Sequence, residues 1–202
     1  MTEPHYRLSE TDTIVHMGRD LRRVISTGRG TSTIIRPEGW EGGYIESERN
    51  LHQGSSAWVH SDARVWDQAI VSGNAEIHGR ACIHGRARIH GSAVVDGNAS
   101  ISADMTISGT VHIHGGAVIT EPVPIWQRTD GYYFILVKNK DGLYHVNAGC
   151  RYFTFDEAWK HWRNHCRKNY ERKLYEETLT ILKGFEAIAQ RPLLKRIRNR
   201  FR

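Results

Sequence analysis

The chain has 202 residues, of which 39% are hydrophobic and 25% are charged, with a formal net charge of +6 at pH 7. These values predict a soluble protein of one modest domain or two small ones, and no stretch approaches the roughly 18 consecutive apolar residues of a membrane-spanning helix. Residues 1–9 lack the apolar centre of a secretory signal, and three cysteines without framework spacing indicate reduced thiols, so we expect a cytoplasmic protein without disulfides.

Residues 1–56 form an irregular leader in which glycines and Pro37 interrupt short apolar runs such as Thr13-Ile14-Val15. This pattern predicts short strands and turns. Because an open end of a repeat array exposes unpaired backbone groups, we expect this segment to be an N-terminal β cap.

Residues 57–121 contain a repeat of six residues. Isoleucine or valine returns at every sixth position from Val59 to Ile119, and alanine stands two residues earlier except at Met105 and Val111. Glycine follows two residues after the aliphatic residue in seven of these hexads. A period of six fits neither a helix nor one continuous strand, so each hexad is expected to be one short strand and one corner.

Three hexads make one triangular coil, and stacked coils place residues that are eighteen apart in the sequence about one strand spacing, ~4.8 Å, from each other. The aliphatic residues then fill the interior as three ladders. The fold class expected is mostly β: a single-stranded parallel β-helix of about eleven hexads, flanked by the leader, a β-hairpin and a C-terminal α-helical segment.

The repeat resembles the hexapeptide-repeat superfamily, although glycine lies one residue later than in many members. The flanks resemble uncharacterised phage and prophage hexapeptide proteins, related to bacterial proteins labelled as transferases. The segments that carry this second resemblance are Tyr6-Arg7-Leu8, residues 42–48, Asn50-Leu51, Ala57-Trp58-Val59, Gly149-Cys150 and residues 154–157. The resemblance implies a left-handed β-helix and a homotrimer; members that are acyltransferases bind acyl-CoA between subunits and use a histidine as general base.

Residues 122–150 are expected to hold a hairpin that caps the other end of the coil, because Pro122 and Pro124 stop the ladder and a turn at residues 139–142 separates two apolar runs. In residues 151–190, the sequence Thr154-Phe155-Asp156-Glu157 is a capping box that should begin a helix. One long helix or two helices joined near Asn169 both fit, with apolar faces that pack on the prism or on another subunit.

The positive charge is concentrated in the last part of the chain. Residues 151–202 carry 14 basic and 6 acidic residues, whereas residues 1–150 carry 14 and 16. We expect helix formation to stop at Pro192 and residues 191–202 to form a basic tail that is either solvated or in contact with nucleic acid or a partner. Its basic residues are Arg191, Lys195, Arg196, Arg198, Arg200 and Arg202.

Stacking also predicts ladders of outward side chains. One ladder is His60, His78, Asp96 and His114; others hold Arg80, Arg86, and Arg88 with His90. Such groups are solubilising surface residues or contacts for an anion, and groups ~4.8 Å apart are too widely spaced for one zinc ion. The predicted ligand-binding residues are therefore His60, His78, Arg80, Arg86, Arg88, His90 and His114, with no metal, cofactor or catalytic residue assigned.

A second group joins Cys150 to His161 and His165 on one helical face, with His145 and Cys166 nearby in the sequence. Histidines four residues apart can share a metal, but the adjacent tryptophans make an ordinary packed helix a sufficient explanation. No metal is therefore assigned to this group.

Three functions stay open. The leading hypothesis is a noncatalytic phage-type protein in the host cytoplasm, an accessory or counter-defence factor that holds a nucleotide, a nucleic acid or a host protein. The second is an acetyl-CoA-dependent acyltransferase with His78, His84, His90 or His114 as base. The third is a structural scaffold whose prism only spaces its two ends.

Overall fold

The computed structural model describes residues 4–29, 36–166 and 171–200, with side chains omitted at 165–166 and 191–200. The chain divides into two compact units between Pro122 and Val123. Unit 1 contains the repeat and the leader, and unit 2 contains the hairpin and the helices. No helix among the described residues is long and apolar enough to cross a membrane.

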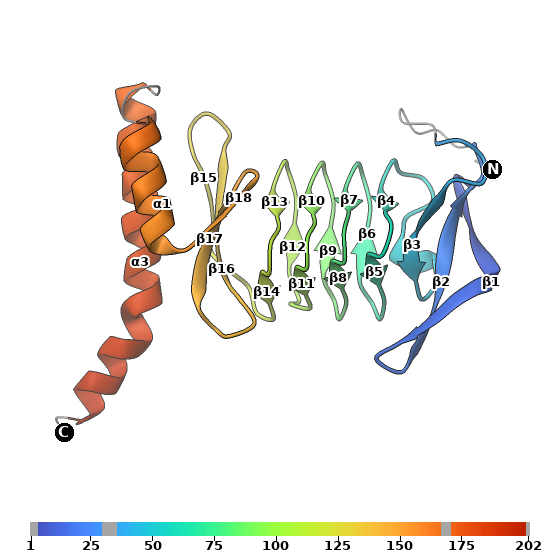
Figure 1. Ribbon diagram of the computed structural model, residues 1–202, viewed down its shortest axis with the longest axis horizontal. Helices are drawn as coiled ribbons and strands as arrows, with labels where there is room; N and C mark the ends of the chain where they lie inside the picture. The colour runs from blue at the N-terminus through green and yellow to red at the C-terminus, as the bar shows by residue number, and fades with distance from the viewer. Residues whose placement is uncertain (1–3, 30–35, 167–170, 201–202) are drawn as a thin grey trace. The chain divides into compact units, whose positions relative to one another are not determined.

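Unit 1 contains a parallel β-solenoid of about four turns. Its strands have two residues each and recur every six residues (Figure 1). They are β4 (Trp58–Val59), β5 (Arg64–Val65), β6 (Ile70–Val71), β7 (Glu76–Ile77), β8 (Cys82–Ile83), β9 (Arg88–Ile89), β10 (Val94–Val95), β11 (Ser100–Ile101), β12 (Thr106–Ile107), β13 (His112–Ile113) and β14 (Val118–Ile119).

The strands form three parallel sheets, β4–β7–β10–β13, β5–β8–β11–β14 and β6–β9–β12. Within each sheet, residues eighteen apart are partners; Val95, for example, pairs with Ile77 on one side and Ile113 on the other. The aliphatic residue of every strand from Val59 to Ile119 is fully buried. The repeat therefore forms the stacked interior that its spacing predicts.

In seven hexads, a glycine two positions after the aliphatic residue makes the corner of the coil. Gly73, Gly91 and Gly109 have φ angles of 68°, 70° and 76°, a left-handed conformation in which a Cβ is unfavourable. A Cβ on Gly91 would also lie 2.7 Å from the Gly109 nitrogen. Glycine meets both demands without strain at these corners, although Ser61 and Asp67 occupy the first two corners with φ angles of 48° and 57°.

The leader of unit 1 forms longer strands than expected. β1 (Tyr6–His16) and β2 (Arg19–Ser26) form an antiparallel hairpin, and β3 (Glu41–Ile45) pairs with β2 and also, in parallel, with β5. A short 3₁₀ helix, η1 (Glu48–Asn50), follows, and Leu51 then makes a parallel bridge to Val71. The leader therefore adds backbone partners to the first coil.

Unit 2 begins with an antiparallel meander of four strands: β15 (Ile125–Gln127), β16 (Tyr133–Lys138), β17 (Tyr144–Ala148) and β18 (Arg151–Phe153). The central pair is the predicted hairpin. Helix α1 (Phe155–His161) begins at the predicted capping box, where the Glu157 amide donates to Thr154 Oγ1 at 3.3 Å. A π-helical turn, η2 (Trp162–Cys166), and helix α3 (Arg172–Arg200) complete the unit.

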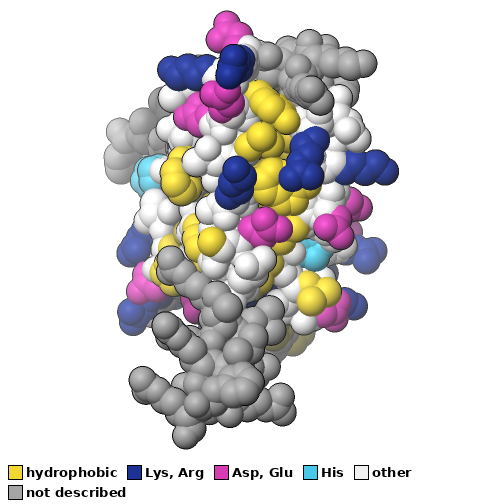
Figure 2. Space-filling view, turned by 90° about the vertical axis from the view of Figure 1, so that its left-hand side faces the viewer, with side chains coloured by type: hydrophobic (Ala, Val, Ile, Leu, Met, Phe, Trp, Pro, Cys, Tyr) yellow, Lys and Arg dark blue, Asp and Glu magenta, His cyan; other side chains and the backbone are white. Residues whose placement is uncertain are grey.

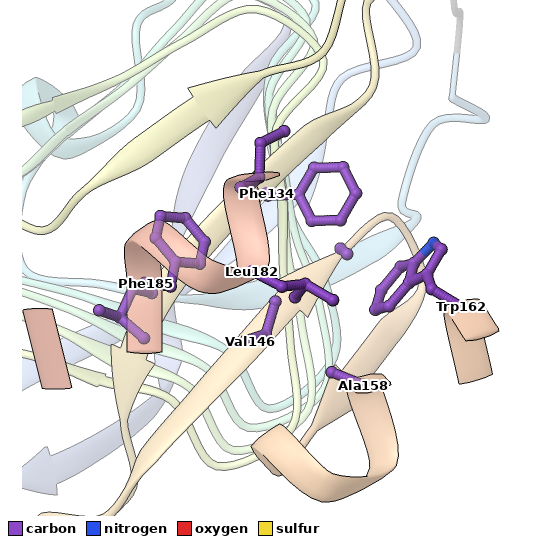
Figure 3. Packing of buried hydrophobic residues seen from close by; sticks show 9 residues of the cluster. Phe134, Val146, Ala158, Trp162, Leu182 and Phe185 are labelled. Carbon is purple, nitrogen blue, oxygen red and sulfur yellow. The ribbon is translucent and has the colours of Figure 1, made fainter. Parts of the chain in front are cut away.

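The apolar faces of the helices pack on the meander of their own unit. Phe134 of β16, Val146 of β17, Ala158, Trp162 and Phe185 share one buried cluster (Figure 3). The expectation that these faces cover the prism or another subunit is therefore corrected: the partner is β16–β17. Figure 2 shows hydrophobic side chains along the middle of the outer face of this unit, with acidic and basic side chains around them.

The expectation that helix formation stops at Pro192 is also wrong, because α3 continues to Arg200. A proline within a helix removes one backbone hydrogen bond and costs about 3 kcal/mol, which weakens a helix without forbidding it.

Candidate functional site

Two outer surfaces of the solenoid gather most of the predicted ligand-binding residues. Residues next to each aliphatic position point outward, since successive side chains of a strand alternate in direction. The sheet β4–β7–β10–β13 carries a surface that we call the histidine–carboxylate face. It consists of His60, Glu76, His78, Asp96, His112 and His114.

The predicted ladder of His60, His78, Asp96 and His114 lies on this face. Glu76 and His112 were missed, because on this sheet the prediction considered only the position after each aliphatic residue, whereas on the sheet of Arg88 and His90 it considered both neighbouring positions. The signal was available: a residue and the one two positions later lie on the same side of a strand. Glu76 is two residues before His78, and His112 is two residues before His114.

One end of the histidine–carboxylate face holds a tight cluster. The rings of His60 and His78 are stacked, with centroids 3.9 Å apart and planes 14° from parallel. His78 Nε2 lies 2.9 Å from Glu76 Oε2, and His60 Nε2 lies 3.8 Å from the same oxygen. Arg36 contacts the other oxygen of Glu76 at 3.3 Å while its guanidinium lies over the Trp58 ring.

Electrostatics set the charge of this cluster. Burial and the neighbouring His78 lower the pKa of His60 to about 4, despite the opposing effect of Glu76. The His60 ring is therefore uncharged at neutral pH. Its Nε2 is buried and has no hydrogen-bond partner among the described residues.

A second histidine–acid pair lies further along the same face. His112 Nε2 is 3.0 Å from Asp96 Oδ2, and the rings of His112 and His114 are 5.2 Å apart. The carboxylates of Glu76 and Asp96 therefore already contact the Nε2 atoms of His78 and His112, and they bring negative charge to this surface. Both effects disfavour an anionic ligand at His60, His78 and His114.

The sheet β6–β9–β12 has a different character. We call its outer surface the basic face: it consists of Ile70, Ser72, Arg88, His90, Thr106 and Ser108. Arg88 and His90 are exposed, and none of these six positions is acidic. Arg86 lies at the adjoining corner, where it pairs with Asp104 at 3.6 Å.

A pocket of about 440 Å³ opens at the end of the basic face that holds Ser72. Its lining offers hydroxyl, amide and imidazole groups, and no acid: His52, Gly54, Ser55, Ser56, Ser72, Gly73 and Asn74. The Ser72 amide donates to the Ile89 carbonyl at 3.0 Å, so the pocket adjoins the strand that precedes His90. This volume falls in the range of small-molecule sites.

The other predicted residues lie apart from these two surfaces. Arg80 is at the corner between β7 and β8. In unit 2, the His145 ring stacks on Tyr152 and the His161 ring packs on Trp162, while Cys150 is exposed. The side chains of His165, Cys166, Arg191, Lys195, Arg196, Arg198, Arg200 and Arg202 lie outside what the structure describes, so the predicted contacts of the basic tail stay predictions.

Comparison with models of known protein families gives no match, and comparison with curated proteins gives none either. The function is therefore inferred from the two surfaces themselves.

Proposed function

We propose that this protein is a noncatalytic binding protein whose solenoid holds an anionic ligand, a nucleotide or a nucleic acid, at the basic face. The observation that carries the proposal is the acid-free pocket of about 440 Å³ next to the exposed Arg88 and His90. Serine hydroxyls, an asparagine amide and an imidazole supply hydrogen-bond donors for phosphate oxygens, and an arginine supplies charge.

The setting of this proposal comes from the resemblance to phage hexapeptide proteins. It comprises a left-handed solenoid that self-associates as a homotrimer in the host cytoplasm, where it acts as an accessory or counter-defence factor.

Calorimetry at low salt against a panel of nucleotides and short nucleic acids tests the proposal. We expect the double variant Arg88→Gln/His90→Gln to bind at least tenfold more weakly than the parent, because a charged contact contributes about 1.5–3 kcal/mol. Arg80→Gln, which removes one exposed charge at another corner, should bind as the parent does. Absence of binding by the parent, or equal losses in both variants, contradicts the proposal.

A chain that ends at residue 190 separates the basic tail from the basic face. Phosphate contacts made by the tail would give affinity that falls steeply with salt and disappears in the shortened chain. Binding that survives the truncation and is lost in Arg88→Gln/His90→Gln belongs to the basic face.

The second candidate function is acyl transfer from acetyl-CoA, which one contact favours. Glu76 lies 2.9 Å from His78 Nε2, and a carboxylate bonded to an imidazole orients the ring and raises its basicity, as a general base requires. Release of CoA thiol in the presence of amine or hydroxyl acceptors, lost in His78→Ala, would establish this reaction. No thiol release with any acceptor would exclude it for that panel.

A further inference from the structure

The histidine–carboxylate face contains a group of side chains with the composition of a metal site. His60, Glu76 and His78 each present one ligand atom, and these three atoms all lie within 4.8 Å of one another. The sequence predicted no metal here, because a ladder of histidines one strand spacing apart is too open for a single ion. Glu76 changes that expectation, because its Oε2 lies 2.9 Å from His78 Nε2 and 3.8 Å from His60 Nε2.

Glu76 is held in position by Arg36. The guanidinium contacts Glu76 Oε1 at 3.3 Å, and the Arg36 side chain is only 9% exposed because it lies against the Trp58 ring. One carboxylate oxygen is therefore fixed and the other faces the histidines. An outer partner that orients a ligating carboxylate in this way is a regular feature of protein metal centres.

His60 supplies the second argument. Its Nε2 is buried without a hydrogen-bond partner among the described residues, and a buried polar atom left unpaired is unfavourable. A metal ion would give this nitrogen a partner. Two imidazoles and one carboxylate are a ligand set of zinc sites that leave a fourth position open to solvent or ligand.

We propose that His60, Glu76 and His78 bind one divalent transition-metal ion, of which Zn²⁺ is the representative. The stacked rings hold their nitrogen lone pairs in nearly parallel planes, so one ring must turn about χ2 for the lone pairs to converge on one ion. That torsion is broad in histidine, so such a turn is accessible to the side chain. The cluster lies on a different sheet from the basic face, so this site does not depend on the anion-binding function.

Asp96 and His112 provide a matched comparison on the same sheet. They too form a histidine–acid contact, at 3.0 Å, but among the described residues only His60, Glu76 and His78 bring three ligand atoms within 4.8 Å of one another. Removal of His112 therefore changes the surface in the same chemical way without removing a proposed ligand.

The test uses the full chain without a histidine tag, stripped with a chelator and titrated with Zn²⁺ in a competition assay. We expect one site per chain, at least a tenfold loss of affinity in His78→Gln and in Glu76→Gln, and parent affinity in His112→Gln. Substitution by Co²⁺ should give the intense visible bands of a tetrahedral ion in the parent and not in His78→Gln. Circular dichroism before each titration verifies that the variants are folded.

Equal loss in His78→Gln and His112→Gln would show that Zn²⁺ binds to scattered surface histidines, and the site would be rejected. The same conclusion follows if the parent shows no one-to-one binding. Arg36→Gln gives an independent measurement: it should weaken Zn²⁺ binding while all three ligands remain, and unchanged affinity would contradict the orienting role of Arg36.

Discussion

Replacement of Gly91 by alanine should destabilise unit 1 more than the same change at another glycine with a similar backbone. Gly91 has a φ of 70°, and a left-handed conformation costs an alanine about 1–2 kcal/mol. The new Cβ would also lie 2.7 Å from the nitrogen and 3.1 Å from the oxygen of Gly109, in the next coil. Both neighbours are backbone atoms, so relief requires the coils to separate, at a cost of about 1–3 kcal/mol.

Gly18 is the matched control. It has a φ of 75° in the turn between β1 and β2, and a Cβ there meets nothing within 4 Å. Gly18→Ala should therefore cost only about 1–2 kcal/mol, whereas Gly91→Ala should cost about 2–5 kcal/mol. Urea denaturation followed by circular dichroism gives both free energies of unfolding. Equal values would refute the conclusion that the corner glycines stack against one another.

Three further changes test the interior, the helix start and the leader. Ile89→Ala should lower the free energy of unfolding by about 2–5 kcal/mol because Ile89 is fully buried, whereas Thr106→Ala on the basic face should change it by no more than about 0.5 kcal/mol. Similar losses for both variants in urea denaturation would contradict the assignment of inward and outward positions. Thr154→Ala should cost about 1 kcal/mol because the Glu157 amide loses its acceptor, and an unchanged thermal midpoint would argue against the capping box. Burial lowers the pKa of His5, so the unfolded chain binds a proton more readily than the folded chain, and the free energy of unfolding should fall as the pH drops below about 6.5. In His5→Gln, the free energy of unfolding measured between pH 7.5 and 5 should depend less on pH. A slope equal to that of the parent would show that another group is responsible.

Much of unit 1 could be predicted from the sequence because a repeat determines its own neighbours. Once Val59 to Ile119 define the period, the pairing of residues eighteen apart follows, and with it the contact of His60 with His78. The residue of this site that was not predicted, Glu76, lies only two residues from His78 in the sequence. Glu76 begins the strand that His78 follows, and its contribution depends on the alternation of side chains along this segment rather than on the repeat.

The partners of unit 2 could not be predicted in the same way. Helical spacing at Trp162 and Phe185 indicates which side of a helix is apolar, but it does not identify the surface that covers it. Here the cover is the meander, whose Phe134 lies in the same cluster. The β1–β2 hairpin was missed for a different reason: its turn at Met17 and Gly18, both with positive φ, has only one glycine as a sequence signal.

The stacking of residues eighteen apart is the claim on which both surfaces depend, and disulfide cross-linking measures it directly. In a chain whose own cysteines are changed to serine, cysteines at Ser72 and His90 should form a disulfide under mild oxidation, because neighbouring strands lie within the Cα separation that a disulfide spans. Cysteines at Ser72 and Ser108, two coils apart, should stay reduced. Rapid oxidation of the second pair, or none of the first, would contradict the stacked arrangement.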